Sequence, residues 1–473
     1  MEDDFNQEGF ENDPEDLIEH YESMIKHGDS FYFDVDDFEQ IVDHYMFINH
    51  IGKGINAVNY AFKIHPYAHS LHIKKAQLLL KNKNPKRAMA VLDEIEMFES
   101  SNTEFHLTKG HAKLLMGQIE AARKDYSIAL SHIVDDDEKV DFLHLIAQNL
   151  QFSDHYPIAA EYLKEALQLS PGNLIVLYDL GYTYDMMGES RKSLACFTEY
   201  IKEDPFADHV WYYIGKIYKK EGEITKAINA YEYAIAINPD FSDAFFELAR
   251  LFETNNQFKE ALQHYEEFIE LENDSVDVLI PKGNCQIALD QLNQAIKTFR
   301  KVLKIDAYHA EAHYLIAISF YKMGKLEEAT FYSKQAIVMD DENHEYWALN
   351  GKINTRLNRR KESINAYVIA TKLKPLFLSY WIFLTDELIK DHQFFRAKDE
   401  LKQALKYHKN SPVLIFRMSA VMYKTENTNQ AAQYFKKGLG IKSSQQKEFF
   451  KIVPEAKKER QIINLLNKNI KKD

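Results

Sequence analysis

One pattern of residue types returns every 34 residues along most of this 473-residue chain. Its clearest copy runs from Asp208 to Phe241, and the same frame gives twelve contiguous repeats ending at residue 445, with one slip of three residues, Asp137–Lys139. A period of this length predicts stacked copies of one supersecondary unit, because a single copy cannot bury its apolar face alone. Repeats 1 to 12 begin at Val35, His69, Thr103, Val140, Leu174, Asp208, Ser242, Val276, Ala310, His344, Leu378 and Pro412.

Two repeat positions hold small residues. Position 20 is occupied only by Gly, Ala or Ser, and position 8 mostly so, with Val42 and Thr385 as departures. We expect these two positions to meet where the two helices of a repeat cross, since bulky side chains there would push the backbones apart. Position 24 is large and apolar and should fill the space between consecutive repeats. Ser333 breaks that column, and Phe331 and Tyr332 are expected to compensate.

Proline marks the end of the second helix in several repeats, because it cannot continue a helix. Pro281 is different, since it falls at position 6, inside an expected first helix. Either that helix starts late and keeps the ring in its first turn, or it is kinked. The late start is the simpler expectation, because proline is well tolerated in a first turn. The other prolines stand at Pro66, Pro171, Pro205, Pro239 and Pro375.

The repeat pattern resembles that of a known family. In the clearest copy the recurring residues are Trp211, Ile214, Gly215, Tyr218, Gly222, Ala227, Tyr231, Ala234 and Pro239. Their spacing resembles the tetratricopeptide repeat (TPR), a helix-turn-helix unit. The resemblance covers roughly nine tenths of the chain. It implies an all-α fold, an α-solenoid in which about twelve repeats form a right-handed superhelix, and a role in binding other proteins. The layout also resembles that of uncharacterised many-TPR proteins of bacteria.

The two ends of the chain carry opposite charge. Residues 1–34 hold twelve acids and one base, Lys26, whereas residues 446–473 hold eight Lys or Arg and four acids. We expect residues 1–12 to be disordered, and a capping helix to follow with Asp13 as N-cap and Pro14 as first residue. The basic segment 446–473 should form a helix that caps the last repeat. The apolar face of the N-terminal helix comprises Leu17, Ile18, Tyr21, Met24 and Ile25.

Composition and motifs argue against several function classes. The array leaves no room for a separate catalytic domain of about 100 residues, so the chain is predicted not to be an enzyme. A net charge of -14 disfavours nucleic-acid binding. The opening has no leader, no apolar run is long enough to span a bilayer, and Cys196 and Cys285 have no metal-like spacing, so a cytoplasmic protein is expected. A single-strand RNA reader and an enzyme with an unrecognised site stay as alternatives.

No metal or cofactor site is predicted. His65, His69 and His72 cluster in one inter-repeat turn, but no cysteine or carboxylate at helical spacing completes a ligand set. Asp34, Asp36 and Asp37 lack the turn glycine of a calcium loop. The segment 51–54, Ile-Gly-Lys-Gly, lacks the arrangement that cradles phosphates.

The binding surface is the better candidate for function. In the TPR family the first helices line the concave side, which implies that positions 2, 5, 9, 12 and 13 point into it. Aromatic and single polar residues recur there in repeats 5 to 9, which predicts a protein or peptide partner of unknown identity, with self-association possible. The alternative is that the rings only brace adjacent first helices. The predicted partner-binding residues are Tyr178, Tyr182, Tyr212, Lys216, Phe246, Arg250, Asn284 and Tyr314.

A known chaperone-tail clamp of TPR proteins is not matched. That clamp places Lys and Asn four apart in one first helix, Asn in the next, and Lys and Arg four apart in the third. Here the nearest elements, Lys216, Arg250, Asn284 and Lys352, are dispersed one per repeat. Recognition of a chaperone tail is therefore not supported.

Overall fold

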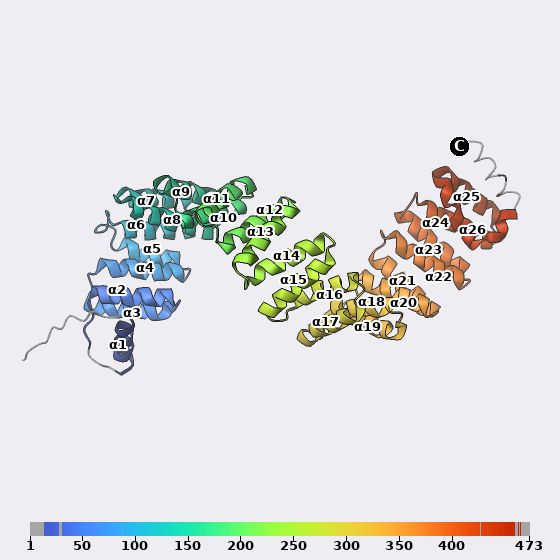
Figure 1. The fold of residues 1–473 in the computed structure, drawn as a ribbon, viewed down its shortest axis with the longest axis horizontal. Helices are drawn as coiled ribbons and strands as arrows, with labels where there is room; N and C mark the ends of the chain where they lie inside the picture. The colour runs from blue at the N-terminus through green and yellow to red at the C-terminus, as the bar shows by residue number, and fades with distance from the viewer. Residues whose placement is uncertain (1–13, 28–30, 426, 459–461, 463, 465–473) are drawn as a thin grey trace, which may run out of the picture. The chain divides into compact units, whose positions relative to one another are not determined.

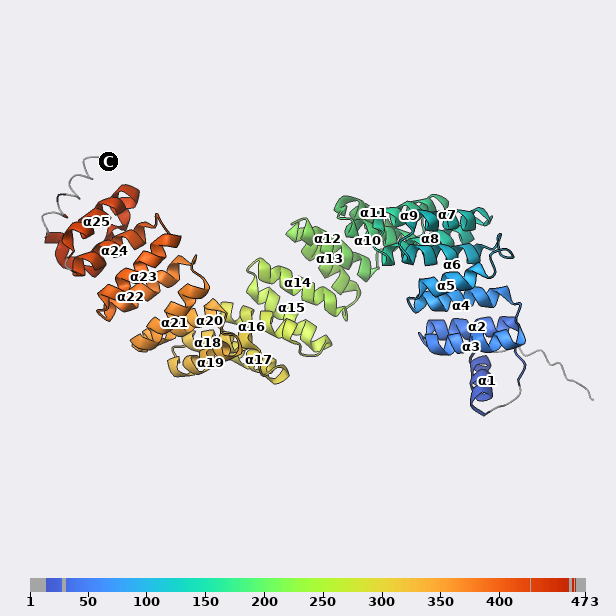
Figure 2. The same ribbon diagram turned by 180° about the vertical axis from the view of Figure 1, so that it is seen from behind.

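A computed structural model of the chain describes residues 14–27, 31–425, 427–458, 462 and 464. Every element in these residues is a helix, and the chain divides into two compact halves, Met1–Ile237 and Asn238–Asp473. In each half consecutive helices lie side by side in both views (Figures 1 and 2). The N-terminal half contains α1 (Pro14–His27), α2 (Val35–Phe47), α3 (Ile51–Ile64), α4 (His69–Lys81), α5 (Pro85–Asp93), α6 (Thr103–Leu115), α7 (Ile119–Ser131), α8 (Asp136–Phe152), α9 (Tyr156–Leu169), α10 (Leu174–Met186), α11 (Ser190–Glu203), α12 (Asp208–Lys220) and α13 (Ile224–Ile237).

The C-terminal half continues the alternation of first and second helices and ends in short helical segments. No helix in the described ranges is long and apolar enough to cross a membrane. The elements are α14 (Ser242–Thr254), α15 (Phe258–Leu271), α16 (Val276–Ala288), α17 (Leu292–Ile305), α18 (Ala310–Lys322), α19 (Leu326–Met339), α20 (His344–Arg356), α21 (Arg360–Leu373), α22 (Leu378–Lys390), α23 (Phe394–Tyr407), α24 (Pro412–Lys424), α25 (Thr428–Lys442), η1 (Ser443–Gln446), α26 (Lys447–Ile452) and η2 (Pro454–Lys458).

First helices begin at the residues where the sequence repeats begin, with one exception. Helix α8 starts at Asp136, four residues before Val140, so the three-residue slip lies inside its first turn. Asp135 makes this possible, because its Oδ1 accepts a hydrogen bond from the backbone N–H of Glu138 at 2.8 Å. The slip therefore lengthens one first helix and leaves the turns on either side unchanged.

Position 15 of the repeat ends each first helix in the left-handed conformation. In the described residues φ at this position lies between 53° and 77°. This geometry satisfies the last carbonyls of a helix and turns the chain into the second helix. Glycine adopts it without steric cost, and asparagine tolerates it, but Lys83 and His392 adopt it under strain. The residues are Asn49, Lys83, Gly117, Asp154, Gly188, Gly222, Asn256, Asp290, Gly324, Asn358 and His392.

The small residues let the two helices of one repeat approach closely. Position 20 meets position 8, since the Ser193 hydroxyl donates to the Gly181 carbonyl oxygen at 2.6 Å. The ring at position 24 covers the glycine at position 8 of its own repeat, and a Cβ on Gly283 would lie 2.3 Å from Phe299. Position 24 thus packs within its repeat as well as against the next one, where the ring centroids of Phe197 and Tyr213 are 5.8 Å apart.

One local expectation was wrong, and another was right only in part. Helix α16 begins at Val276 and contains Pro281 in its interior, so it does not start late. The carbonyl that Pro281 leaves without a donor belongs to Asp277, which is exposed and can be solvated. Of the two residues expected to compensate at Ser333, Phe331 is 58% exposed, whereas Tyr332 is partly buried and stacks on Phe320 with centroids 5.6 Å apart. The buried Asn350 side chain also donates to the Ser333 hydroxyl at 2.9 Å, so a polar bridge fills the gap.

The N-terminal helix covers the first repeat. Leu17, Tyr21 and Met24 are buried in one cluster with Phe38 and Tyr45, so α1 hides the face that repeat 1 would otherwise expose. Ile18 is partly buried there and Ile25 is exposed. The expected N-cap Asp13 and residues 1–12 lie outside the described residues.

The C-terminal cap is not one helix. It consists of η1, which leads directly into α26, and of η2, which follows after a break at Val453. Phe449 and Val453 are buried with Phe416 and Phe435 of the last repeat, which covers its apolar end. Residues 459–461, 463 and 465–473 lie outside the described residues.

Candidate functional site

The aromatic residues predicted on α10 contact the next first helix. The Tyr178 ring lies 5.6 Å from Tyr213 and 5.9 Å from Phe197, measured between centroids. The Tyr182 ring lies 6.3 Å from Tyr213. Burial and a hydrogen bond with Tyr213 raise the pKa of Tyr178, which keeps its hydroxyl neutral at ordinary pH. These rings pack α10 against α12 and remain partly exposed.

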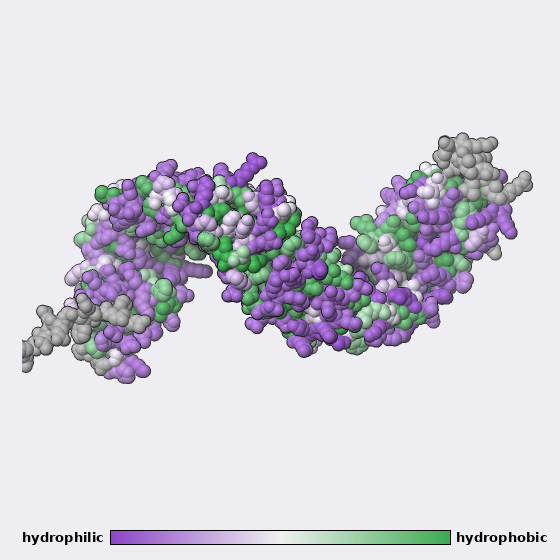
Figure 3. Space-filling model, in the orientation of Figure 1, coloured by the Kyte–Doolittle hydropathy of each residue, from purple (hydrophilic) through white to green (hydrophobic). Residues whose placement is uncertain are grey.

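Helix α12 adds an exposed cation to this cluster. The Lys216 Nζ lies 5.6 Å from the centroid of the Tyr212 ring and 5.0 Å from that of Tyr213. Tyr212 also packs on Tyr231 at 5.8 Å. Sequence reasoning missed Tyr213, which occupies position 6, although it is the ring that Tyr178, Tyr182 and Lys216 share. Figure 3 shows hydrophobic residues at the surface over α10 to α13.

The four predicted residues of the C-terminal half are arranged in smaller groups. The Phe246 ring contacts Phe268 at 5.3 Å, and the exposed Arg250 guanidinium lies 5.8 Å from the Phe246 centroid. Tyr314 packs on Tyr346 at 4.8 Å, and burial raises its pKa. Asn284 is partly buried on α16. In both halves, therefore, the aromatic rings have packing partners, and the exposed groups are the cations Lys216 and Arg250.

A recess on the first helices of repeats 1 to 4 was not foreseen from sequence. Its volume is about 600 Å³, and it is lined by α2, α4, α6 and α8 alone. Its apolar lining comes from Met46, Leu80, Leu107, Phe142 and Leu145, of which Leu145 is 45% exposed. Its polar lining residues are Gln77, Lys81, Glu104, Thr108, His111 and Asn149.

The polar groups of the recess largely pair with one another. Gln77 Nε2 donates to Glu104 Oε1 at 2.9 Å and to the Thr108 hydroxyl at 3.3 Å. Lys81 Nζ donates to the backbone oxygen of Met46 at 2.5 Å. Burial lowers the pKa of His111, so its imidazole is neutral at pH 7. The recess is therefore an apolar surface with few polar groups that still need a partner.

Exposed apolar side chains also occur at repeat position 13 of the first helices. Phe47 is 88% exposed and Phe152 is 90% exposed, and both end their first helices. Leu115 and Met186 occupy the same position on α6 and α10 and are also exposed. Phe47 and Phe152 contribute little to packing at this exposure, so they are candidates for contact with a partner. A column of position 13 in the aligned repeats would have revealed them.

The remaining polar clusters have structural roles. His65 Nε2 contacts the Phe33 backbone oxygen at 2.9 Å, and His69 pairs with Glu99 at 3.0 Å. Asp34 and Asp37 form a reciprocal capping box at the start of α2. Within the described ranges no group of three or more His, Cys, Asp or Glu side chains is arranged to hold a metal ion.

Family models match the centre of the chain. The model "TPR repeat" matches residues 215–256, and the model "Tetratricopeptide repeat" matches residues 242–275 and 277–309. Residues 215–309 of the chain are therefore tetratricopeptide repeats. TPR arrays are generally non-enzymatic and serve as scaffolds for protein interaction, and this is the general role that the repeats support here. No curated relative matches the chain.

Three solved structures with similar helices have low sequence identity to this chain. A tetratricopeptide repeat protein from Parabacteroides merdae is 17% identical, with 53% of this chain and 98% of that chain covered and a TM-score of 0.37. YrrB, described as a TPR protein with an unusual peptide-binding site, is 16% identical. The match covers 38% of this chain and 92% of that chain, with a TM-score of 0.34. The Cut9–Hcn1 hetero-tetramer of the APC/C is 14% identical, with 96% and 92% covered and a TM-score of 0.34. At such values these likenesses say nothing about the partner of this chain.

Proposed function

We propose that this chain is an interaction scaffold that binds an apolar segment of a partner protein along its first helices. The observation that carries the proposal is the recess of about 600 Å³ on α2, α4, α6 and α8, together with the exposed apolar side chains at position 13 of first helices. Recesses of this size accept several large side chains, and binding energy in such interfaces concentrates in a few buried anchors.

The chemistry of the partner follows from the lining. Gln77, Glu104 and Thr108 already hydrogen-bond one another, so a polar ligand would have to break those contacts. An amphipathic helix or an extended segment with apolar anchors would instead bury Leu145 and Phe152 without such a cost. Each of these side chains could contribute roughly 1.5–3 kcal/mol if fully buried.

The predicted residues on the first helices of each half belong to the same proposal. Lys216 on α12 and Arg250 on α14 are exposed cations held over aromatic rings, which limits their rotamers before a partner arrives. They would supply polar contacts to carboxylates of the partner, while Tyr178, Tyr182 and Tyr212 supply apolar edges. Reading of single-stranded RNA, the alternative function, would need open aromatic rings on which bases can stack. Among the described residues of these first helices the rings pack on each other instead.

The experiment compares captured partners of three forms of the full chain in the native cell. Leu145→Ser with Phe152→Ser removes two exposed apolar contacts of the first helices. Phe331→Ser with Phe395→Ser is the matched control, because both side chains are exposed on second helices. We expect the first pair to reduce the recovery of a specific partner at least about tenfold and the control to retain it. Equal recovery with all three forms, at unchanged melting temperature, would refute the proposal.

A further inference from the structure

Repeat position 13 changes its chemistry along the chain. In the first five repeats it carries Phe47, Leu115, Phe152 and Met186, with Lys81 as the one cation. In the last four repeats every occupant is basic: Lys322, Arg356, Lys390 and Lys424. Because the cation recurs every 34 residues, these basic side chains lie at equivalent places on successive first helices.

The contacts of Arg356 show how this column is arranged. Its Nη1 donates to the backbone oxygen of Tyr321 at 3.1 Å, and its guanidinium lies 4.8 Å from the centroid of the Tyr321 ring. Tyr321 directly precedes Lys322 at the end of α18, so Arg356 reaches back to the position of Lys322 in the preceding repeat. Lys352 lies one turn earlier on α20, with its Nζ 5.8 Å from the Phe383 centroid. We refer to these three cations, Lys322, Lys352 and Arg356, as the basic surface.

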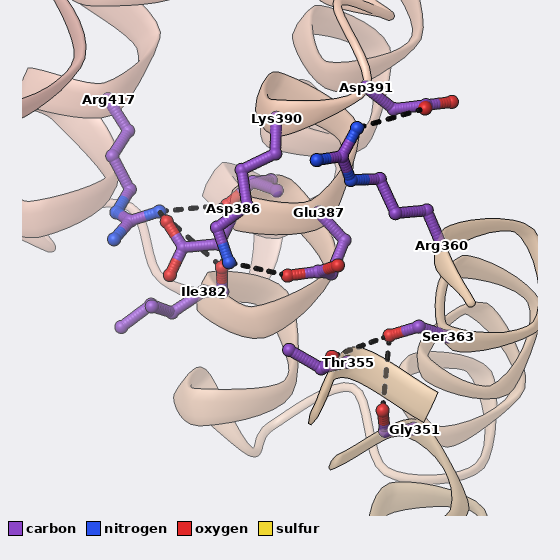
Figure 4. A network of polar contacts seen from close by, with 11 residues as sticks. Gly351, Thr355, Arg360, Ser363, Ile382, Asp386, Glu387, Lys390, Asp391 and Arg417 are labelled. Atoms are coloured by element: carbon purple, nitrogen blue, oxygen red, sulfur yellow. Dashed lines mark hydrogen bonds and ion pairs between the residues drawn. The ribbon is translucent and has the colours of Figure 1, made fainter. Parts of the chain in front are cut away.

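The carboxylates of the neighbouring first helix are already engaged. Figure 4 shows Asp386 directed at Arg417 and Glu387 directed at Lys390, at 2.5 and 2.7 Å. The basic surface, by contrast, has no carboxylate within ion-pair distance among the described residues. Its three cations are exposed and carry uncompensated positive charge.

An acidic segment that also carries aromatic rings would fit this surface. Ile318 and Tyr321 of α18 are only partly buried beside the cations, so apolar contacts are available there. The first thirteen residues of this chain hold six acids, no base, and two phenylalanines, Phe5 and Phe10. They precede α1, which begins at Pro14. The six acids of this segment complement the charge of the basic surface, and its two phenylalanines can contact the apolar side chains there. These two features favour this segment over an anion without aromatic rings.

We propose that the basic surface binds residues 1–13 of a second copy of the chain. The contact joins different surfaces of the two copies, so it is heterologous, and a pair of copies keeps one free donor segment and one free acceptor surface. Self-association through this contact would increase with protein concentration and weaken with salt, since exposed charges are screened within about 8–10 Å at physiological ionic strength.

The test uses a fluorescent peptide of residues 1–13 titrated with the full chain, read by anisotropy in 50 and 500 mM NaCl. We expect binding at low salt that weakens at least about tenfold at high salt and in K322E/K352E/R356E. The matched control, K297E/R300E/K304E, makes the same charge change with three exposed cations of α17 and should bind like wild type. If the reversed variant melts early, K322Q/K352Q/R356Q replaces it.

Sedimentation of the full chain supplies the second readout. Association should rise with concentration and disappear when residues 1–13 are removed or when the free peptide is added in excess. The peptide with Phe5→Ser and Phe10→Ser should bind at least about threefold more weakly, because it loses the apolar contacts. The proposal would be overturned if the peptide did not bind at 50 mM NaCl, or if the α17 control variant lost as much peptide affinity as the reversed variant. It would also be overturned if the full chain stayed a monomer at every concentration, or if the surface bound oligouridine in place of the peptide.

Discussion

Gly283→Ala should destabilise the protein although alanine is the better helix former. An alanine Cβ at this position would lie 2.3 Å from Cε1 and 2.4 Å from Cζ of Phe299, whose ring is fully buried. Overpacking of this kind costs about 1–3 kcal/mol, and the clash lies at the severe end because both partners are held by packing. The gain in helix propensity offsets about 1 kcal/mol. We expect a net loss of about 2 kcal/mol in the free energy of unfolding.

The same substitution at Gly52 is the control. No heavy atom lies within 4 Å of a Cβ placed there, so Gly52→Ala should leave stability unchanged or raise it by up to about 1 kcal/mol. The assay is urea unfolding, supported by hydrogen exchange of α16 and α17, because a repeat array can open locally.

A second substitution separates the clash from other causes. The double variant Gly283→Ala/Phe299→Leu should lose less stability than the sum of the two single variants. The difference, which is the coupling energy, should be about 0.5–3 kcal/mol. Additive costs of Gly283→Ala and Phe299→Leu would refute the reasoning, since the ring would then not be what the added methyl meets. So would equal effects of alanine at positions 283 and 52.

Three further predictions follow from single side chains. Lys83→Gly should stabilise the turn after α4 by about 1 kcal/mol in urea unfolding, because φ is 53° there and a side chain is strained; an unchanged midpoint would contradict this. Arg417→Ala should cost about 3–5 kcal/mol, because Asp386 and Glu448 lose their buried partner, and hydrogen exchange should show α26 loosened; protection equal to wild type would contradict it. The folded-state pKa of His111 is lowered, so the unfolded chain binds more protons and stability falls as pH drops through about 6.5; His111→Gln should weaken this dependence between pH 7 and 5, and an identical pH profile would contradict it.

The helices could be predicted from the sequence because the 34-residue period requires the same residue types at the same positions of every repeat. The small residues at positions 8 and 20 have one physical reason for recurring, which is the close crossing seen between Ser193 and Gly181. Local exceptions depend on three-dimensional contacts that no single repeat displays. Pro281 is accommodated inside α16 and Asn350 replaces the missing ring at Ser333, and neither solution is visible in the repeat pattern.

The candidate surface was less predictable than the fold. Position alone could place Tyr178 and Tyr212 on first helices, but not show that Tyr213 joins them into one cluster. The recess of repeats 1 to 4 depends on which side chains leave space between four helices, and composition does not report empty space. Whether the inner-wall aromatics bind a partner or only brace the stack stays a prediction.

Photocrosslinking in the native cell tests the central claim most directly. A photoreactive phenylalanine analogue placed at Phe152, which is 90% exposed at the end of a first helix, should crosslink to a specific partner. The same analogue at Phe395, which is 71% exposed on the second helix α23, is the matched control and should give at least about tenfold less of that product. Equal yields at both positions, or a partner captured from Phe395 alone, would contradict binding along the first helices.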